Sequence, residues 1–123
     1  EELATAQAAL EAAGVEVVVD GDWSLDVAPP VETVLALALR EAVTNVVRHA
    51  KAHRTTMSLE QVGQGVGLRV TDDGVGLPAE SLGQGTGLRG MRERVVAAGG
   101  SVEISGRRGT TLEVVMPFGG VPS

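Results

Sequence analysis

The hydrophobic and polar positions of this chain alternate between the period of a helix and the period of a strand. Helical spacing covers three segments, and β-branched or alternating runs cover five others. Gly14 follows the first helical segment, as is typical of a residue just beyond a helix C-terminus. Pro29 and Pro30 disfavour a helix before position 31, where the second helix is predicted to begin. In chain order, the pattern predicts helix 1–13, strand 15–20, helix 31–50, strands 54–62 and 66–73, helix 87–98, and strands 101–105 and 110–116.

The order of these elements predicts an α/β fold. The four later strands form two hairpins, which turn at Gly63–Gly65 and at Gly106–Gly109. Two hairpins combined with helices favour a mixed sheet whose helices pack on one face, a two-layer α/β sandwich. The 123 residues are enough for one domain, and residues 118–123 form a short C-terminal tail rich in Gly and Pro.

Composition excludes several classes of protein. Lys and Arg number 10 against 16 Asp and Glu, and the chain has one Trp and one Phe, so we expect no nucleic-acid surface. No cysteine is present to form a disulfide or a thiolate metal site. No apolar run reaches the roughly 18 residues that span a bilayer, so we expect no membrane contact by this domain. Because the sequence opens on Glu1 and lacks a basic leader, we interpret it as a fragment of a longer protein.

A line of polar residues runs along the second helix. At about 100° per residue, Glu41, Asn45 and His49 fall on one narrow line, and Arg48 lies beside Glu41. This line borders the arc expected to face the core, which consists of Leu35, Leu39, Ala42, Val43, Val46, Val47 and Ala50.

Two interpretations of this line stay open. It could be an ordinary solvated helix edge. It could also be a metal and phosphate edge, because an amide oxygen of Asn45 suits Mg²⁺ when phosphates supply the negative charge. Glu41 would then orient a water or accept a proton, and Arg48 would hold phosphate oxygens.

A second candidate site follows the strand 66–73. Asp72-Asp73-Gly74-Val75-Gly76 reads either as a plain turn or as the floor of a base pocket. Glycines at 74 and 76 allow the backbone to approach a planar ligand closely. A buried Asp72 could accept a hydrogen bond from an exocyclic amine, which adenine presents at that edge and guanine does not.

A third candidate is the segment Gly83-Gln84-Gly85-Thr86-Gly87-Leu88, which precedes a helix. It is either a mobile linker or a loop whose free N–H groups bind phosphate.

The chain contains no Gly-x-x-x-x-Gly-Lys-[Ser/Thr] motif of a P-loop. Gly85 to Gly90 matches Gly-x-Gly-x-x-Gly, but a loop precedes it where a dinucleotide fold requires a strand.

Together, these segments resemble the N, G1 and G2 boxes of the GHKL ATPase superfamily. The N box is Glu41-x-x-x-Asn45-x-x-Arg48-His49, the G1 box Asp72-x-Gly74-x-Gly76, and the G2 box Gly83-x-Gly85-x-Gly87-Leu88. Gly109-Thr110 and Pro117 match the closing strand of that family. The stretch Gly87 to Arg94, followed by Gly99-Gly100, resembles histidine kinases that pair with NarL-type response regulators. The match covers Leu10 to Pro117.

The resemblance implies a Bergerat-type sandwich of about five strands and three helices, with ATP and Mg²⁺ as its cofactors. It implies that Asp72 binds the adenine amino group with support from Thr110, and that Asn45 holds the metal. Glu41 matches the catalytic base or water-orienting position. The remaining residues implied to bind the nucleotide are Arg48 and His49 near the phosphates, Gly74 and Gly76 in the base pocket, and Gly83, Gly85, Gly87 and Leu88 in the lid.

The resemblance further implies a cytoplasmic catalytic domain that transfers the γ-phosphoryl of ATP to a histidine of a separate dimerisation and phosphoacceptor domain. A response regulator would act downstream, and whether the full-length protein is membrane-anchored stays open. Neither His49 nor His53 has the sequence context of an acceptor. Arg89, Met91 and Arg92 could form a docking surface for the helical domain.

Two features qualify the resemblance. The segment between Gly76 and Gly83 is short for a lid, and the only Phe of the chain, Phe118, lies outside this segment.

Two alternatives remain open: an anti-sigma-factor serine kinase of the same superfamily, and a nucleotide-sensing interaction module without catalysis.

Overall fold

The computed structural model describes residues 2–50, 52–74, 86–105 and 109–117. The elements in chain order are α1 (Glu2–Ala12), β1 (Glu16–Gly21), α2 (Pro29–Asn45), the π-helical turn η1 (Val46–Ala50), β2 (Arg54–Val62), β3 (Gly65–Asp72), α4 (Thr86–Ala97), β4 (Ser101–Ser105) and β5 (Thr110–Pro117).

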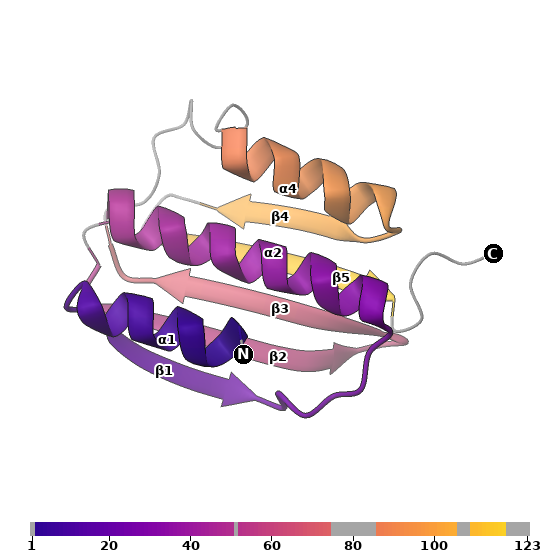
Figure 1. Ribbon diagram of the computed structural model, residues 1–123, viewed down its shortest axis with the longest axis horizontal. Coiled ribbons are helices and arrows are strands. Elements are labelled where there is room, and N and C mark those ends of the chain that lie inside the picture. Colours follow the sequence, from indigo (N-terminus) through magenta and orange to yellow (C-terminus); the bar gives the residue numbers. More distant parts are fainter. Residues whose placement is uncertain (1, 51, 75–85, 106–108, 118–123) are drawn as a thin grey trace.

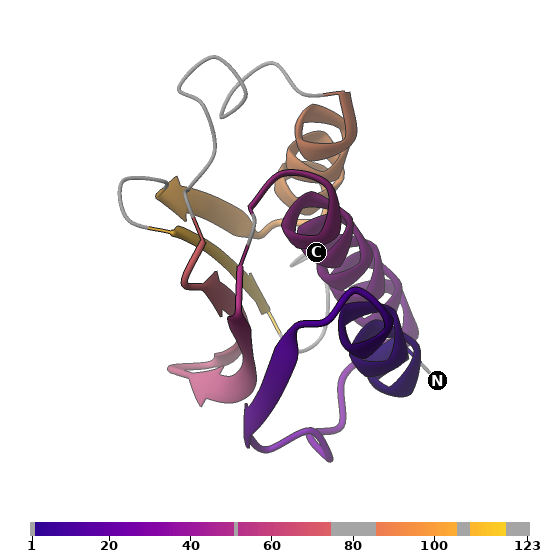
Figure 2. The same cartoon turned by 90° about the vertical axis from the view of Figure 1, so that its left-hand side faces the viewer.

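The five strands form one mixed sheet in the order β1-β2-β3-β5-β4. β1 runs parallel to β2, and the other three pairs are antiparallel. Figure 1 and Figure 2 show α1, α2 and α4 side by side on one face of this sheet. The structure therefore confirms the two-layer α/β sandwich with five strands and three helices.

The core lies between the helices and the sheet, and strand alternation selects its residues. On β2, Thr55, Met57 and Leu59 are buried, while the residues between them face the open side of the sheet. The helices contribute mainly aliphatic side chains, and the buried hydrophobic residues of α2 are Val31, Leu35, Ala38, Leu39, Ala42 and Val43.

The structure places Met91 in this core. Met91 is 1% exposed, and Val95 one turn further along α4 is fully buried. Arg89 and Arg92 are exposed. The expectation that Met91 forms part of a docking surface is therefore wrong, because the apolar side of α4 is needed to cover β4 and β5.

The second helix differs from its prediction at both ends. It begins at Pro29, since the first turn of a helix needs no backbone N–H donor and tolerates proline. Regular helix ends at Asn45, and Val46–Ala50 continue as a π-helical turn. Val47, expected in the core, is 46% exposed. Because the π-helical turn is wider than an α-helical turn, Val47 lies at a different angle around the helix from the one that regular helical spacing predicts.

The other predicted elements agree with the structure to within one or two residues at each end. Gly14 has a φ of +81°, which fits its predicted place beyond the C-terminus of α1. No helix in the described ranges is long and apolar enough to cross a membrane.

Chain direction brings three ends together at one end of the sandwich. α2 finishes there at Asn45, β3 finishes at Asp72, and β5 starts at Thr110. Asp72 and Thr110 are cross-strand partners in the β3–β5 register. This end, on the left in Figure 1, holds the candidate site.

Candidate functional site

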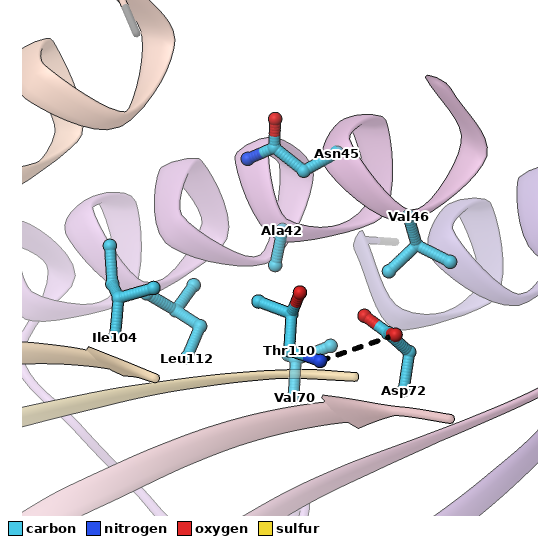
Figure 3. A pocket seen from close by; sticks show the side chains of 8 residues that line it. All are labelled: Ala42, Asn45, Val46, Val70, Asp72, Ile104, Thr110 and Leu112. Atoms are coloured by element: carbon cyan, nitrogen blue, oxygen red, sulfur yellow. Dashed lines mark hydrogen bonds between the residues drawn. The ribbon is translucent and has the colours of Figure 1, made fainter. Parts of the chain in front are cut away.

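A cavity of about 20 Å³ lies between α2 and the sheet at this end. That space is large enough for roughly one water molecule. Figure 3 shows the lining side chains, with apolar ones around Asp72 and Thr110 and the amide of Asn45 farther from the sheet. The lining residues are Ala42, Asn45 and Val46 on the helix side, and Val70, Asp72, Ile104, Thr110 and Leu112 on the sheet side.

Asp72 is the buried carboxylate of this cavity, with 4% of its surface exposed. Its Oδ1 accepts hydrogen bonds from the backbone N–H groups of Gly74, at 2.8 Å, and Thr110, at 3.3 Å. Burial raises the pKa of Asp72 above its ordinary value, against the effect of those two bonds. The neighbouring charge of Asp73 raises it further. The carboxylate is thus held in place by one oxygen, and Oδ2 makes no hydrogen bond to a described residue.

Thr110 contributes a hydroxyl to the same cavity. Its Oγ1 is buried and has no hydrogen-bond partner among the described residues. Figure 3 shows this hydroxyl turned toward the space beneath α2, beside the carboxylate of Asp72. An unpartnered buried hydroxyl costs roughly 1–3 kcal/mol, so the cavity presents an acceptor and a hydroxyl that a polar ligand would satisfy.

Gly109 determines how closely the two strands approach at this point. Its φ is +77°, and a Cβ at this position would collide with the carbonyl oxygen of Asp72. The sequence pattern predicted Gly109 only as the end of a hairpin turn and the entry to the closing strand, whereas the structure shows that it fixes the backbone that carries Asp72. A glycine directly before a β-branched strand was the available signal.

Asp73 points to the opposite side of the strand end. Its Oδ1 accepts hydrogen bonds from the backbone N–H groups of His53, at 2.8 Å, and Arg54, at 2.9 Å. The bonds from Arg54 and His53 lower the pKa of Asp73. Of two adjacent carboxylates, one therefore faces the cavity and the other fastens the start of β2.

The polar line on α2 divides into residues with different surroundings. Asn45 lines the cavity, and Figure 3 shows its amide farther from the sheet than Asp72 and Thr110. Glu41 is half-buried and does not line the cavity. Arg48 is exposed in η1 and forms no ion pair with Glu41 in the described structure. The backbone of His49 belongs to η1, and its side chain lies outside what is described.

The predicted glycines are placed only in part. The backbone N–H of Gly74 holds Asp72, which fits its position in the predicted base pocket. Gly87 and Leu88 fall in the first turn of α4, and the side chain of Leu88 is not described. Gly76, Gly83 and Gly85 lie outside the described residues.

The apolar wall of the cavity was not predicted from the sequence. Val70, Ile104 and Leu112 form the sheet side, and Val46 forms part of the helix side. They come from four elements, so no local pattern in the sequence links them. Alternation on the strands was the available signal, since it predicts inward-facing positions without saying which of them border a cavity.

The chain is similar to sensor histidine kinases. The profile of the family described as histidine kinase-, DNA gyrase B-, and HSP90-like ATPase matches residues 31–120. The sensor histidine kinase DesK of Bacillus subtilis is 36% identical over 119 residues, covering 95% of this chain and 32% of DesK. The signal transduction histidine-protein kinase/phosphatase UhpB of Salmonella typhimurium is 40% identical over 104 residues, covering 78% of this chain and 20% of UhpB. The chain thus spans a third or less of these two relatives.

Solved structures show the same fold. Full-length ShkA in complex with AMPPNP superimposes with a TM-score of 0.77 at 20% identity, over 99% of this chain and 29% of ShkA. The histidine kinase domain of the blue-light activated kinase EL346 from Erythrobacter litoralis gives 0.76 at 24% identity, over 95% of this chain and 59% of that domain. The chain belongs to the histidine kinase-, DNA gyrase B- and HSP90-like ATPase family and corresponds to the ATP-binding catalytic domain of sensor histidine kinases in two-component signalling.

Proposed function

We propose that this domain binds ATP with Mg²⁺ and transfers the γ-phosphoryl group to a histidine on a separate helical domain of the same kinase. The observation that carries the proposal is the cavity in which the buried carboxylate of Asp72 lies beside the unpartnered hydroxyl of Thr110, with Asn45 on the helix side. ShkA, whose full-length structure is in complex with AMPPNP, shares this fold, which supports nucleotide binding by the domain.

Adenine recognition follows from the chemistry of the two sheet residues. The free oxygen of Asp72 accepts a hydrogen bond from the exocyclic amine of adenine, while its Oδ1 stays fixed by Gly74 and Thr110. The Thr110 hydroxyl either donates to a ring nitrogen or holds a water that does so. Guanine offers a carbonyl oxygen at the corresponding edge, and two acceptors facing each other repel. The site therefore selects ATP over GTP.

The donor set at the helix end fits Mg²⁺ only together with phosphate. Asn45 provides one neutral amide oxygen, and the described residues contain no group of three or more His, Asp or Glu that could hold a metal by themselves. Mg²⁺ is commonly held by one or two protein oxygens plus substrate phosphates and water. Asn45 would therefore bind a metal ion that the triphosphate brings with it, and the metal would neutralise phosphate charge during transfer.

The phosphate end requires residues beyond the cavity. We assign Arg48 and His49 of η1, and the lid glycines Gly83, Gly85 and Gly87, to the phosphates. In the transfer, a ring nitrogen of the acceptor imidazole forms a bond to the γ-phosphorus. The bond from that phosphorus to the bridging oxygen breaks, and ADP leaves with the electron pair. Glu41 orients the acceptor imidazole or accepts its proton.

The partners follow from the same proposal. Residues 1–123 form one catalytic domain of a longer cytoplasmic or membrane-anchored kinase, whose helical phosphoacceptor domain supplies the reactive histidine. A response regulator of the NarL type then receives the phosphoryl group. The named relatives are sensor histidine kinases, which favours this function over an anti-sigma-factor serine kinase.

A nucleotide titration tests the proposal. The purified chain should bind ATP in a Mg²⁺-dependent manner and GTP at least about tenfold more weakly, since a charge-assisted hydrogen bond contributes about 1.5–3 kcal/mol. Asp72→Asn should remove most of the difference between ATP and GTP, and Asp73→Asn serves as its control because Asp73 faces away from the cavity. Equal binding of ATP and GTP by the native chain would contradict the proposed role of Asp72.

A transfer assay tests the kinase function separately. The chain alone should not label His49 or His53 with the γ-phosphoryl of ATP, and added phosphoacceptor domain should become labelled. A chain that binds ATP but never transfers phosphoryl to such a domain would be a nucleotide-sensing module instead.

A further inference from the structure

A row of three polar residues crosses the sheet at the level of the cavity. Thr55 on β2 is the cross-strand partner of Asp72 on β3, and Asp72 is the partner of Thr110 on β5. Thr55 and Asp72 are the two buried polar or charged side chains in the part of the chain that the structure describes. Thr110 and Asp72 belong to the proposed nucleotide site. Thr55 does not line the cavity.

The pairing brings the side chains of Thr55 and Asp72 close together. The neighbouring pair Arg54 and Asp73 is joined by a backbone hydrogen bond from the N–H of Asp73 to the carbonyl oxygen of Arg54. Since hydrogen-bonded and non-hydrogen-bonded pairs alternate along an antiparallel ladder, Thr55 and Asp72 form a non-hydrogen-bonded pair. In such pairs the side chains approach most closely, with Cβ atoms about 4.5–5.5 Å apart.

The hydroxyl of Thr55 has no structural purpose in the described fold. Thr55 is fully buried, and its Oγ1 has no hydrogen-bond partner among the described residues. Valine has nearly the same shape and avoids the cost of burying an unpartnered hydroxyl. Folding alone would therefore favour valine at this position. The nearest polar group across the ladder is the carboxylate of Asp72, whose Oδ1 is already bonded to Gly74 and Thr110.

We propose that Thr55 is a positioning residue for nucleotide recognition, whose hydroxyl donates a hydrogen bond to the carboxylate of Asp72 when adenine is bound. The proposal rests on the proposed function of this site. A rotation about the Cα–Cβ bond of Thr55 turns its hydroxyl toward the carboxylate. The bond fixes the carboxylate from the side opposite Thr110 and keeps it ionised, so that it stays an acceptor toward the adenine amine.

The surroundings of Asp72 make its ionisation sensitive to this one donor. Within the described ranges, the residues of other elements that line the cavity with Asp72 are Ala42, Asn45 and Val46 on the helix side and Ile104, Thr110 and Leu112 on the sheet side, and none of them titrates. The charged neighbour that acts on it is Asp73, which favours the protonated form. A donated hydrogen bond from Thr55 opposes that effect. Loss of this bond should raise the pH at which ATP binding is lost on acidification.

Thr55→Val and Thr55→Ser test the proposal, with Thr56→Val as the matched control on the open face of the same strand. Thr55→Val should weaken Mg²⁺·ATP binding about tenfold, the size expected for one hydrogen bond to a charged group. Its acid midpoint of ATP binding should move to higher pH, while its thermal unfolding temperature should equal or exceed that of the native chain. Thr55→Ser should retain native binding, and Thr56→Val should leave both properties unchanged.

Three results would overturn the inference. Native ATP affinity and acid midpoint in Thr55→Val would show that the hydroxyl is idle. A loss of binding that Thr55→Ser shares would show that the methyl group matters rather than the hydroxyl. If Thr55→Val does not fold, Thr55→Ala gives the same comparison against Thr55→Ser. Failure of the native chain itself to bind ATP would refute both the proposed function and this inference. That outcome can be told apart from a failure of the Thr55 inference alone, because it is observed without any variant.

Discussion

The backbone of Gly109 lies directly against the carbonyl group of Asp72, leaving no room for a side chain at position 109. This contact joins the start of β5 to the end of β3. It also brings the N–H of Thr110 within 3.3 Å of the Asp72 carboxylate. The carboxylate that we assign to adenine recognition is therefore positioned by a residue that never touches the ligand cavity.

Gly109→Ala should disturb both the fold and the site. The new Cβ would collide with the Asp72 backbone, and alanine is strained at a φ of +77°. We expect a loss of about 2–4 kcal/mol in the free energy of unfolding, from strain and overpacking together. Denaturant unfolding and an ATP titration measure the two effects.

Gly14→Ala is the matched control for that experiment. Gly14 has a φ of +81° but nothing within 4 Å of the position of a Cβ. It should lose only about 1 kcal/mol through backbone strain, and its ATP affinity should be native. If the two variants lose the same stability and the same affinity, the contact between Gly109 and Asp72 has no special role.

Asp72→Asn should reduce the preference for ATP over GTP without destabilising the fold at neutral pH. Burial raises the folded-state pKa of Asp72, so its ionised form weakens folding above that pKa, and the penalty disappears as pH falls below the unfolded-state value. Asparagine keeps an acceptor for Gly74 and Thr110 without the charge. At about pH 7 the variant should be at least as stable as the native chain. Urea unfolding over a pH series should show this advantage shrinking toward acid, and a large destabilisation at neutral pH would contradict the assignment.

Asp73→Ala should lower the thermal unfolding temperature, because it frees the N–H groups of His53 and Arg54 at the start of β2. The pKa of Asp73 is lowered in the folded state, so its contribution is present above the unfolded-state pKa and is lost as pH falls through the folded-state value. The native chain and Asp73→Ala should therefore converge in acid. Asp73→Asn keeps a carbonyl acceptor and should stay closer to the native chain. A gap that persists unchanged in acid would mean that the carboxylate charge is not the cause.

Asn45→Ala should remove the Mg²⁺ dependence of ATP binding and abolish phosphoryl transfer to an added phosphoacceptor domain. The variant loses the one amide oxygen that lines the cavity from α2. Titrations with and without Mg²⁺ measure the effect. Thr44→Ala is a suitable control, because the Thr44 hydroxyl donates only to the carbonyl of Arg40 in the same helix. A native response to Mg²⁺ in Asn45→Ala would exclude the assigned metal ligand.

Local pattern was sufficient for the elements and for part of the site. Strand 54–62 was predicted with its observed bounds, because alternation and β-branching are properties of neighbouring residues. The exposure of Val47 could not be predicted, because the π-helical turn changes the angular spacing that the helical pattern assumes. The burial of Met91 was equally hidden, since it depends on which side of α4 meets the sheet.

By itself, the sequence determined the order of helices and strands, the two-layer architecture and the residues that resemble the family boxes, since spacing and side-chain chemistry are local. Only the tertiary structure decided that Asn45, Asp72 and Thr110 border one cavity, that Gly109 fixes the backbone beneath the carboxylate, and that Thr55 lies buried beside it. These relationships join residues up to 65 positions apart, from Asn45 to Thr110. They exist because sheet register and helix packing bring distant chain ends to the same end of the sandwich.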